Sequence, residues 1–239
     1  MLIKRMSKIF QLALIMSLLL PVMACAEKEA VSAAPSASET RAAPKHKVFR
    51  ENIQYTELFS PVPTSVDPGK VEVVEMFWYG CPHCFRLEPE LQKWAKSKPA
   101  DIELVRIPGV LNPAWKLGAR VFYAAQTLGK LDDLHEALFQ AIHEQHRQLR
   151  NEDAVIRFVE SQGVDGKAFR DAMHSMAVDT KVARAEELAR LYGVTGVPAL
   201  VVGGKYRVLS NGVKSYEEMF EVVDFLADKV REEAKAERN

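Results

Sequence analysis

The feature that most constrains this chain is a run of β-branched and apolar residues followed directly by a helical segment. Residues 71–77, VEVVEMF, predict a buried central strand. The helix is expected over about residues 81–97, with Pro82 at its first position, where the missing N–H costs little. Residues 101–107 predict a second strand parallel to the first, because a helix crosses between the two.

The rest of the chain adds a helical block and then returns to strands. Residues 113–180 have helical periodicity throughout, and a loop with Pro198 precedes a hairpin over residues 199–208. A last amphipathic helix is expected from Ser215. The fold class is therefore α/β with an inserted helical subdomain. The expected parts are residues 48–112, the helical insert 113–180, and residues 181–239.

The N-terminus has the pattern of a secretory signal peptide over residues 1–26. Three basic residues precede an apolar run at 9–20, which is shorter than the ~20 residues that a spanning helix needs. Small residues follow the run, and residues 27–47 are rich in Ala, Ser, Pro and charge, which predicts a disordered linker. The chain is therefore expected to be exported.

Two cleavage patterns overlap at the end of this segment. Residues 24–26 fit an A-x-A cleavage site, whereas residues 22–25 resemble a lipobox, which would make residues 1–24 a lipoprotein signal and leave Cys25 lipidated as a membrane tether. Met23 is unusual at its lipobox position. Cys25 is removed or lipidated, so the mature chain keeps a single close pair, Cys81 and Cys84.

Charge gives no sign of a nucleic acid or an anionic membrane surface as the main partner. Lys plus Arg and Asp plus Glu number 32 each, so the formal net charge is zero.

The cysteine pair has three conceivable uses: a zinc half-site, a structural crosslink or a redox switch. The sequence has no second C-x-x-C, and His143 and His146 lack the H-E-x-x-H spacing, so no metal site is expected. A disulfide across two residues closes too small a loop to stabilise a fold much. A C-x-x-C motif beside a β-α-β unit instead predicts a thioredoxin-like redox site.

The two sulfurs are expected to be unequal. Cys81 lies at a helix N-terminus, where unpaired N–H groups and the helix dipole lower the pKa of a thiol. A protonated His83 adds a second cationic partner and favours the reduced form, which makes the disulfide a stronger oxidant. Cys84 lies one turn into the helix and should be more buried, so it is the predicted resolving cysteine.

Together, VEVVEMFWYGCPHCFRLEPEL and TGVPALVVGGKY resemble the DsbA group of thioredoxin-fold thiol:disulfide interchange proteins of the bacterial periplasm. The resemblance covers residues 48 to 231 and includes the helical insert. The centre Pro82-His83 is typical of the oxidase branch of that group. The resemblance implies a thioredoxin-like fold, periplasmic location and no cofactor.

The resemblance also implies roles for residues outside the motif. Val197-Pro198 matches the family's cis-proline loop, where the backbone of the preceding residue pairs with substrate. Glu75 matches a buried acid that relays the proton of Cys84, although a strand glutamate is also a common salt-bridge partner. Trp78 and Tyr79 flank the reactive sulfur and are expected on an apolar rim for unfolded substrates. Phe85 and Leu87 fit a rim or a core position equally.

The expected function is an exported dithiol oxidase that passes its disulfide to reduced, folding proteins through a mixed disulfide on Cys81. The resemblance implies a quinone-linked inner-membrane oxidase of the DsbB type as the re-oxidant. A reductase or isomerase on the same fold is the main alternative. A peptide-binding holdase with an incidental C-x-x-C is the alternative from another class.

Overall fold

The computed structural model describes residues 47–237 of the chain. The predicted signal peptide, nearly all of the predicted linker and Cys25 lie outside these residues. Among residues 47–237, no helix combines the length and apolar character that crossing a membrane requires.

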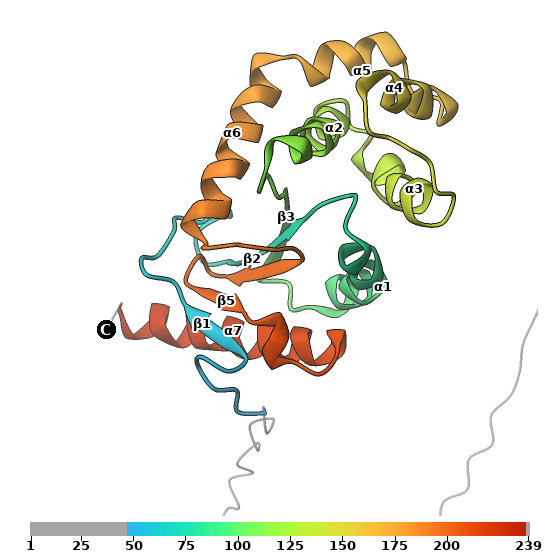
Figure 1. Cartoon of the computed structure of the whole chain (residues 1–239). Coiled ribbons are helices and arrows are strands. Elements are labelled where there is room, and N and C mark those ends of the chain that lie inside the picture. Colours follow the sequence, from blue (N-terminus) through green and yellow to red (C-terminus); the bar gives the residue numbers. More distant parts are fainter. Residues whose placement is uncertain (1–46, 238–239) are drawn as a thin grey trace, which may run out of the picture. The chain divides into compact units, whose positions relative to one another are not determined.

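A five-stranded mixed sheet forms the centre of the fold (Figure 1). The strands, in spatial order, are β1 (Tyr55–Glu57), β5 (Tyr206–Val208), β4 (Ala199–Val202), β2 (Val71–Phe77) and β3 (Ile102–Pro108). Strands β2 and β3 are parallel, and the other pairs are antiparallel. The predicted strand at residues 71–77 is confirmed, and the next strand lies one residue later than predicted.

Helix α1 (Pro82–Ser97) connects β2 to β3, as the β-α-β pattern predicts. Its residues Leu87 and Leu91 are fully buried, and they belong to a core that α1 shares with α7 (Tyr216–Ala236) and one face of the sheet. Because side chains alternate along a strand, Val73 joins this core, whereas Val74 points to the opposite face. Glu75 lies two residues after Val73, so its side chain points to the same face as that of Val73.

Val74 belongs to a second apolar core, and most residues of that core come from the helical insert. Its helices are α2 (Lys116–Thr127), α3 (Leu131–His143), α4 (Glu152–Ser161), α5 (Gly166–Met173) and α6 (Met176–Leu191), preceded by a 3₁₀ turn, Pro113–Trp115. The expected boundary at residue 180 falls inside α6, which is continuous because buried Val178 and Val182 carry one apolar face through it. The chain therefore has no break at that boundary.

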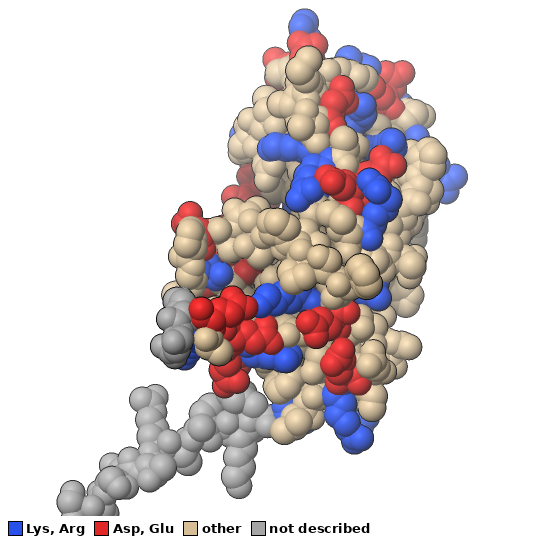
Figure 2. Space-filling view, turned by 90° about the vertical axis from the view of Figure 1, so that its left-hand side faces the viewer, with Lys and Arg blue, Asp and Glu red and all other residues tan. Residues whose placement is uncertain are grey.

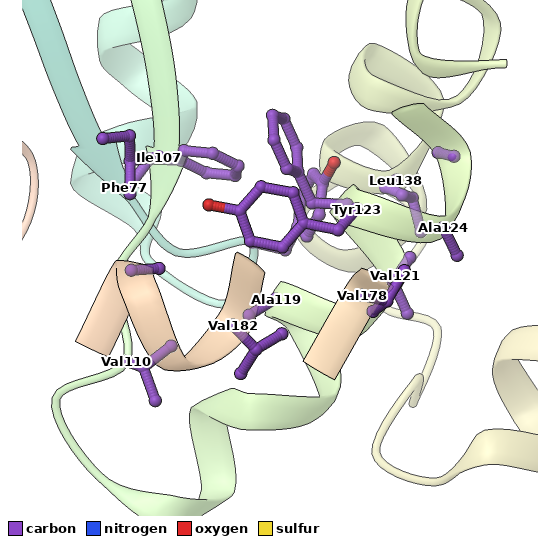
Figure 3. Close-up of a cluster of buried hydrophobic side chains, with 14 of the residues drawn as sticks. Phe77, Ile107, Val110, Ala119, Val121, Tyr123, Ala124, Leu138, Val178 and Val182 are labelled. Atoms are coloured by element: carbon purple, nitrogen blue, oxygen red, sulfur yellow. The ribbon is translucent and has the colours of Figure 1, made fainter. Parts of the chain in front are cut away.

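Insert and sheet are joined by a shared apolar cluster (Figure 3). Phe77 and Ile107 from the sheet belong to the same cluster as Ala119 and Tyr123 of α2 and Val182 of α6. All five are buried, so the insert is packed onto the end of β2 from which the cysteine motif begins. On the outer surface drawn in Figure 2, acidic and basic side chains are interspersed, in keeping with the zero net charge.

Candidate active site

The cysteine motif lies in the turn between β2 and α1. Cys81 is the N-cap residue of α1, and its sulfur accepts a hydrogen bond from the backbone N–H of Cys84 at 3.4 Å. Pro82 occupies the first helical position, as predicted. Both cysteines are thiols in this structure. Cys81 is 7% exposed and Cys84 is completely buried, so the predicted difference in access between the two sulfurs is present.

The environment of Cys81 favours its thiolate. The pKa of Cys81 is lowered to about 6, first by the hydrogen bond from the Cys84 thiol and then by the backbone amides of Cys84 and His83. The charge of His83 acts in the same direction but is the smallest of these contributions. The His83 side chain is exposed and lies against Arg86 (Nδ1 to Nη2, 3.0 Å). Burial opposes the shift in Cys81 and raises the pKa of Cys84.

The loop before β4 completes the surroundings of the reactive sulfur. The Val197–Pro198 peptide bond is cis, and the carbonyl of Val197 accepts a hydrogen bond from the Cys81 sulfur at 3.3 Å. This contact joins residues 116 positions apart in the chain. It arises because β4 pairs with β2, with Ala199 opposite Met76, so the ends of the two strands meet beside the motif.

Replacing Cys84 by alanine should raise the pKa of Cys81 from about 6. The substitution removes the thiol donor that contributes most to the shift and keeps the backbone N–H groups, so the pKa should remain below the ordinary ~8.5 of a cysteine. The ultraviolet absorbance of the thiolate measures this as a function of pH. A control variant, Cys81→Ala, should show no thiolate in the same range. An unchanged titration in Cys84→Ala would assign the shift to the helix N-terminus alone.

Glu75 lies in the middle of β2, fully buried on the α1 face. Its Oε2 is 3.3 Å from Nε of Arg106, its neighbour in register on β3. The geometry is not that of a hydrogen bond, and neither carboxylate oxygen of Glu75 has a hydrogen-bond partner among residues 47–237. Burial and the nearby charge of Glu88 raise the pKa of Glu75 to about 8, although Arg106 acts in the opposite direction. The carboxyl also influences Cys84, whose pKa it raises further when ionised.

Three charged or titratable groups of this site were missed in the sequence: Glu88 and His135, which are buried, and Arg106, which is half-buried. Glu88 and Arg106 form an ion pair (Oε2 to Nη2, 3.3 Å), and His135 of α3 contacts the other oxygen of Glu88 (Nε2 to Oε1, 3.0 Å). Helical spacing offers a signal for Glu88, since it lies four residues after Cys84 on the same face of α1. No comparable signal exists for His135, which comes from the insert.

The expected rim is only partly formed. Trp78 is half-buried and stacks on Trp115 of the insert, with ring centroids 4.4 Å apart. Tyr79 is mostly buried, with its hydroxyl 3.0 Å from Nδ1 of His135 inside the aromatic core, although it also lines a hollow beside the motif. Leu87 is core, and Phe85 is half-buried against His143 of α3.

Two hollows flank the motif. One, of about 780 Å³, is lined by His83, the loop with Pro198 and the first turn of α7. The other, of about 640 Å³, lies between Trp78, Pro82 and the insert, so the insert forms a wall beside the motif.

Comparisons with known proteins agree with this geometry. Residues 72–223 match the model of the "DSBA-like thioredoxin domain" family. The "Thiol:disulfide interchange protein DsbA" of Pseudomonas aeruginosa is 41% identical over 182 residues, which is 76% of this chain and 86% of that protein. Its counterpart in Pseudomonas syringae is 42% identical over 183 residues, 77% of this chain and 85% of that protein.

Solved structures give the same result. A crystal structure of Pseudomonas aeruginosa DsbA superposes with a TM-score of 0.74 at 40% identity, over 78% of this chain and 97% of that one. The oxidoreductase NmDsbA1 of Neisseria meningitidis superposes with a TM-score of 0.69 at 34% identity, over 78% and 96% of the two chains.

Proposed function

Because this chain belongs to the DsbA-like thioredoxin-domain family and is a thiol:disulfide oxidoreductase, we propose that it is an exported dithiol oxidase of proteins. It donates the Cys81–Cys84 disulfide to reduced, folding substrates. The observation that carries this proposal is the inequality of the two sulfurs. Cys81 keeps a small exposed area, 7%, and has a lowered pKa, whereas Cys84 is completely buried and has a raised pKa. A pair that holds one sulfur as a stable thiolate favours the dithiol and therefore gives up its disulfide readily.

The reaction transfers two electrons from substrate to enzyme. A substrate thiolate attacks the sulfur of Cys81, the Cys81–Cys84 bond breaks, and a mixed disulfide forms between substrate and Cys81. Cys84 leaves as a thiolate and takes up a proton. A second substrate thiolate then attacks the substrate sulfur of the mixed disulfide and releases Cys81 as a thiolate. The substrate ends as a disulfide and the enzyme as a dithiol. In the reverse direction, Cys84 resolves the mixed disulfide.

We infer that Glu75 supplies the proton that the leaving Cys84 sulfur needs. With a pKa of about 8, its carboxyl is protonated at neutral pH, and within the described part of the chain it has no hydrogen-bond partner that would hold that proton elsewhere. When the enzyme is re-oxidised, the same carboxylate takes the proton back from the Cys84 thiol.

Substrate is proposed to bind along the loop with Val197 and Pro198. The Val197 carbonyl faces the Cys81 sulfur, so a chain whose cysteine reaches that sulfur runs close to the backbone of this loop. Trp78 is the remaining candidate for an apolar contact on the other side. Tyr79 is not proposed, since its side chain is buried.

Location and partners follow the family. The protein is proposed to work in the periplasm, either free or tethered through a lipidated Cys25. A quinone-linked membrane oxidase of the DsbB type is proposed to restore its disulfide. Export agrees with the N-terminal basic and apolar pattern of the sequence.

The equilibrium of the Cys81–Cys84 couple with glutathione tests the direction of electron flow. We expect an oxidising couple, because the Cys81 thiolate is stabilised. Its dithiol should persist at ratios of oxidised to reduced glutathione that would convert thioredoxin to its disulfide. Alkylation of free thiols followed by mass measurement reports the reduced fraction. A potential close to that of thioredoxin would instead support the reductase or isomerase alternative.

A further inference from the structure

His135 lies at the centre of a buried polar contact between the insert and the acid pair. It is 7% exposed, and its ring packs edge-on against Phe77 and Phe139, with centroids 5.1 and 5.3 Å away. Within this apolar surrounding it makes two contacts at 3.0 Å, from Nδ1 to the hydroxyl of Tyr79 and from Nε2 to Oε1 of Glu88. A buried imidazole with both nitrogens engaged is held in one orientation.

The partners determine which way these hydrogen bonds run. An ionised carboxylate only accepts hydrogen bonds, so Nε2 of His135 carries the hydrogen that Glu88 receives. The other oxygen of Glu88 accepts from Nη2 of Arg106 at 3.3 Å and from Nε2 of Gln92 at 3.5 Å. Glu88 thus has three donors, whereas the oxygens of Glu75 have none among the described residues.

We propose that His135 is a positioning residue that assigns the negative charge of the two buried acids to Glu88 and thereby leaves the proton on Glu75. The proposal rests on the proposed function, in which the proton of Glu75 passes to Cys84. One guanidinium, that of Arg106, lies between the two carboxyls, with 3.3 Å contacts to both. This guanidinium donates a hydrogen bond to Glu88 but none to Glu75, so it already favours charge on Glu88. The donor from His135 strengthens this bias on the other oxygen of Glu88.

The electrostatics of the pair agree with this assignment. Burial acts to raise the pKa of Glu88, but the hydrogen bond from His135 and the charge of Arg106 outweigh it and hold that pKa below the ordinary value. The pKa of Glu75 moves the other way. The titratable and charged groups facing the pair are Tyr79 from the turn, Cys84 from α1, Arg106 from β3 and His135 from α3.

The proposal assigns a proton to a defined step. When a substrate thiolate forms its bond to the Cys81 sulfur, the bond between Cys81 and Cys84 breaks, and Cys84 keeps the electron pair. The O–H bond of Glu75 then breaks, its proton moves to the Cys84 sulfur, and a Glu75 carboxylate remains. If the charge lay on Glu75 instead of Glu88, this proton would be missing at the start.

The test is the pH dependence of that step. The oxidised enzyme is mixed with excess cysteine-containing peptide, the reaction is quenched with acid, and the free thiols are alkylated and weighed. The observed rate constant is divided by the concentration of ionised peptide thiol at each pH, which removes the titration of the peptide itself from the profile. In the wild type it should stay level and then fall as Glu75 loses its proton, around pH 8. In His135→Leu the fall should begin roughly one pH unit lower, the size expected from losing one hydrogen bond to a charged group.

Matched variants separate this role from packing. His135→Gln keeps an N–H for Glu88 and should restore the wild-type midpoint. His135→Asn is too short to reach Glu88, keeps a polar contact for Tyr79, and should shift like the Leu variant even if the latter folds poorly. In a Glu75→Gln background, His135→Leu should add no shift, since the titrating group is gone.

The outcomes are distinguishable. If the wild type oxidises the peptide and the Leu and Asn variants keep its midpoint, the role of His135 is wrong and the proposed function stands. If the wild type does not oxidise the peptide, both are wrong. If His135→Leu shifts the pH midpoint by the same amount in the Glu75→Gln background, the proposal is also wrong, because His135 would then not act through Glu75.

Discussion

Replacing Cys81 by alanine should reduce the oxidation of a reduced, unfolded protein to the uncatalysed rate. The remaining sulfur, Cys84, is completely buried and its pKa is raised, so it is neither accessible nor ionised for attack. Removing a nucleophile of this kind costs a factor on the order of 10³ or more in the rate. The measurement is the regain of activity of a reduced test enzyme, with oxidised glutathione supplying the disulfides.

The partner variant Cys84→Ala distinguishes a lost site from a lost fold. It should also fail to oxidise the test enzyme, but its Cys81 should still form a stable mixed disulfide with glutathione, visible as a mass increase. Cys81→Ala should form none. Undiminished oxidation by Cys81→Ala would refute the proposed function, and mixed disulfides on Cys84 would refute the unequal roles of the two sulfurs.

Replacing Glu75 by leucine should stabilise the protein while impairing its redox reaction. Both carboxylate oxygens lack a hydrogen-bond partner among residues 47–237 and the side chain is fully buried, so the charged form is costly to keep in the fold. The pKa of Glu75 in the folded state, about 8, lies above its value in the unfolded chain. Burying this carboxyl therefore lowers the free energy of unfolding little below about pH 4. The cost grows as pH rises toward 8 and is constant beyond it.

The expected gain in the free energy of unfolding is about 3 kcal/mol near pH 8, after allowing for the ion pair that Arg106 loses. It should shrink toward zero in mild acid. Urea denaturation at several pH values measures it. Glu75→Gln is the control, since it keeps the shape and removes the charge; its stability should vary with pH as that of the leucine variant does. A leucine variant less stable than the wild type at every pH would show that the acid pair holds the fold together.

The strand and the motif were predictable because their signals are local. Residues 71–77 have the composition of a buried strand, and a cysteine at a helix start has a defined electrostatic environment whatever lies around it. The role of Val197 beside the reactive cysteine was predicted only from the family resemblance. Sequence spacing does not show that β4 brings its carbonyl to Cys81.

The remaining parts of the site depend on contacts that local patterns do not encode. Tyr79 and His135 meet 56 positions apart, and this contact turns an expected surface ring into a buried one. The pairing of Arg106 with two acids depends on the register between β2 and β3. The continuity of α6 through residue 180 reflects its packing on α2, and no sequence signal marks where the insert ends.

The two halves of the reactive centre are also separated in time. A chain that is synthesised or exported from its N-terminus presents both cysteines long before the Val197 carbonyl that contacts Cys81. Between them the whole insert must appear, and β4 must then pair with β2. A chain stopped short of β4 therefore carries both thiols without the carbonyl that contacts Cys81. The complete centre can assemble only after nearly the whole domain has been made or exported.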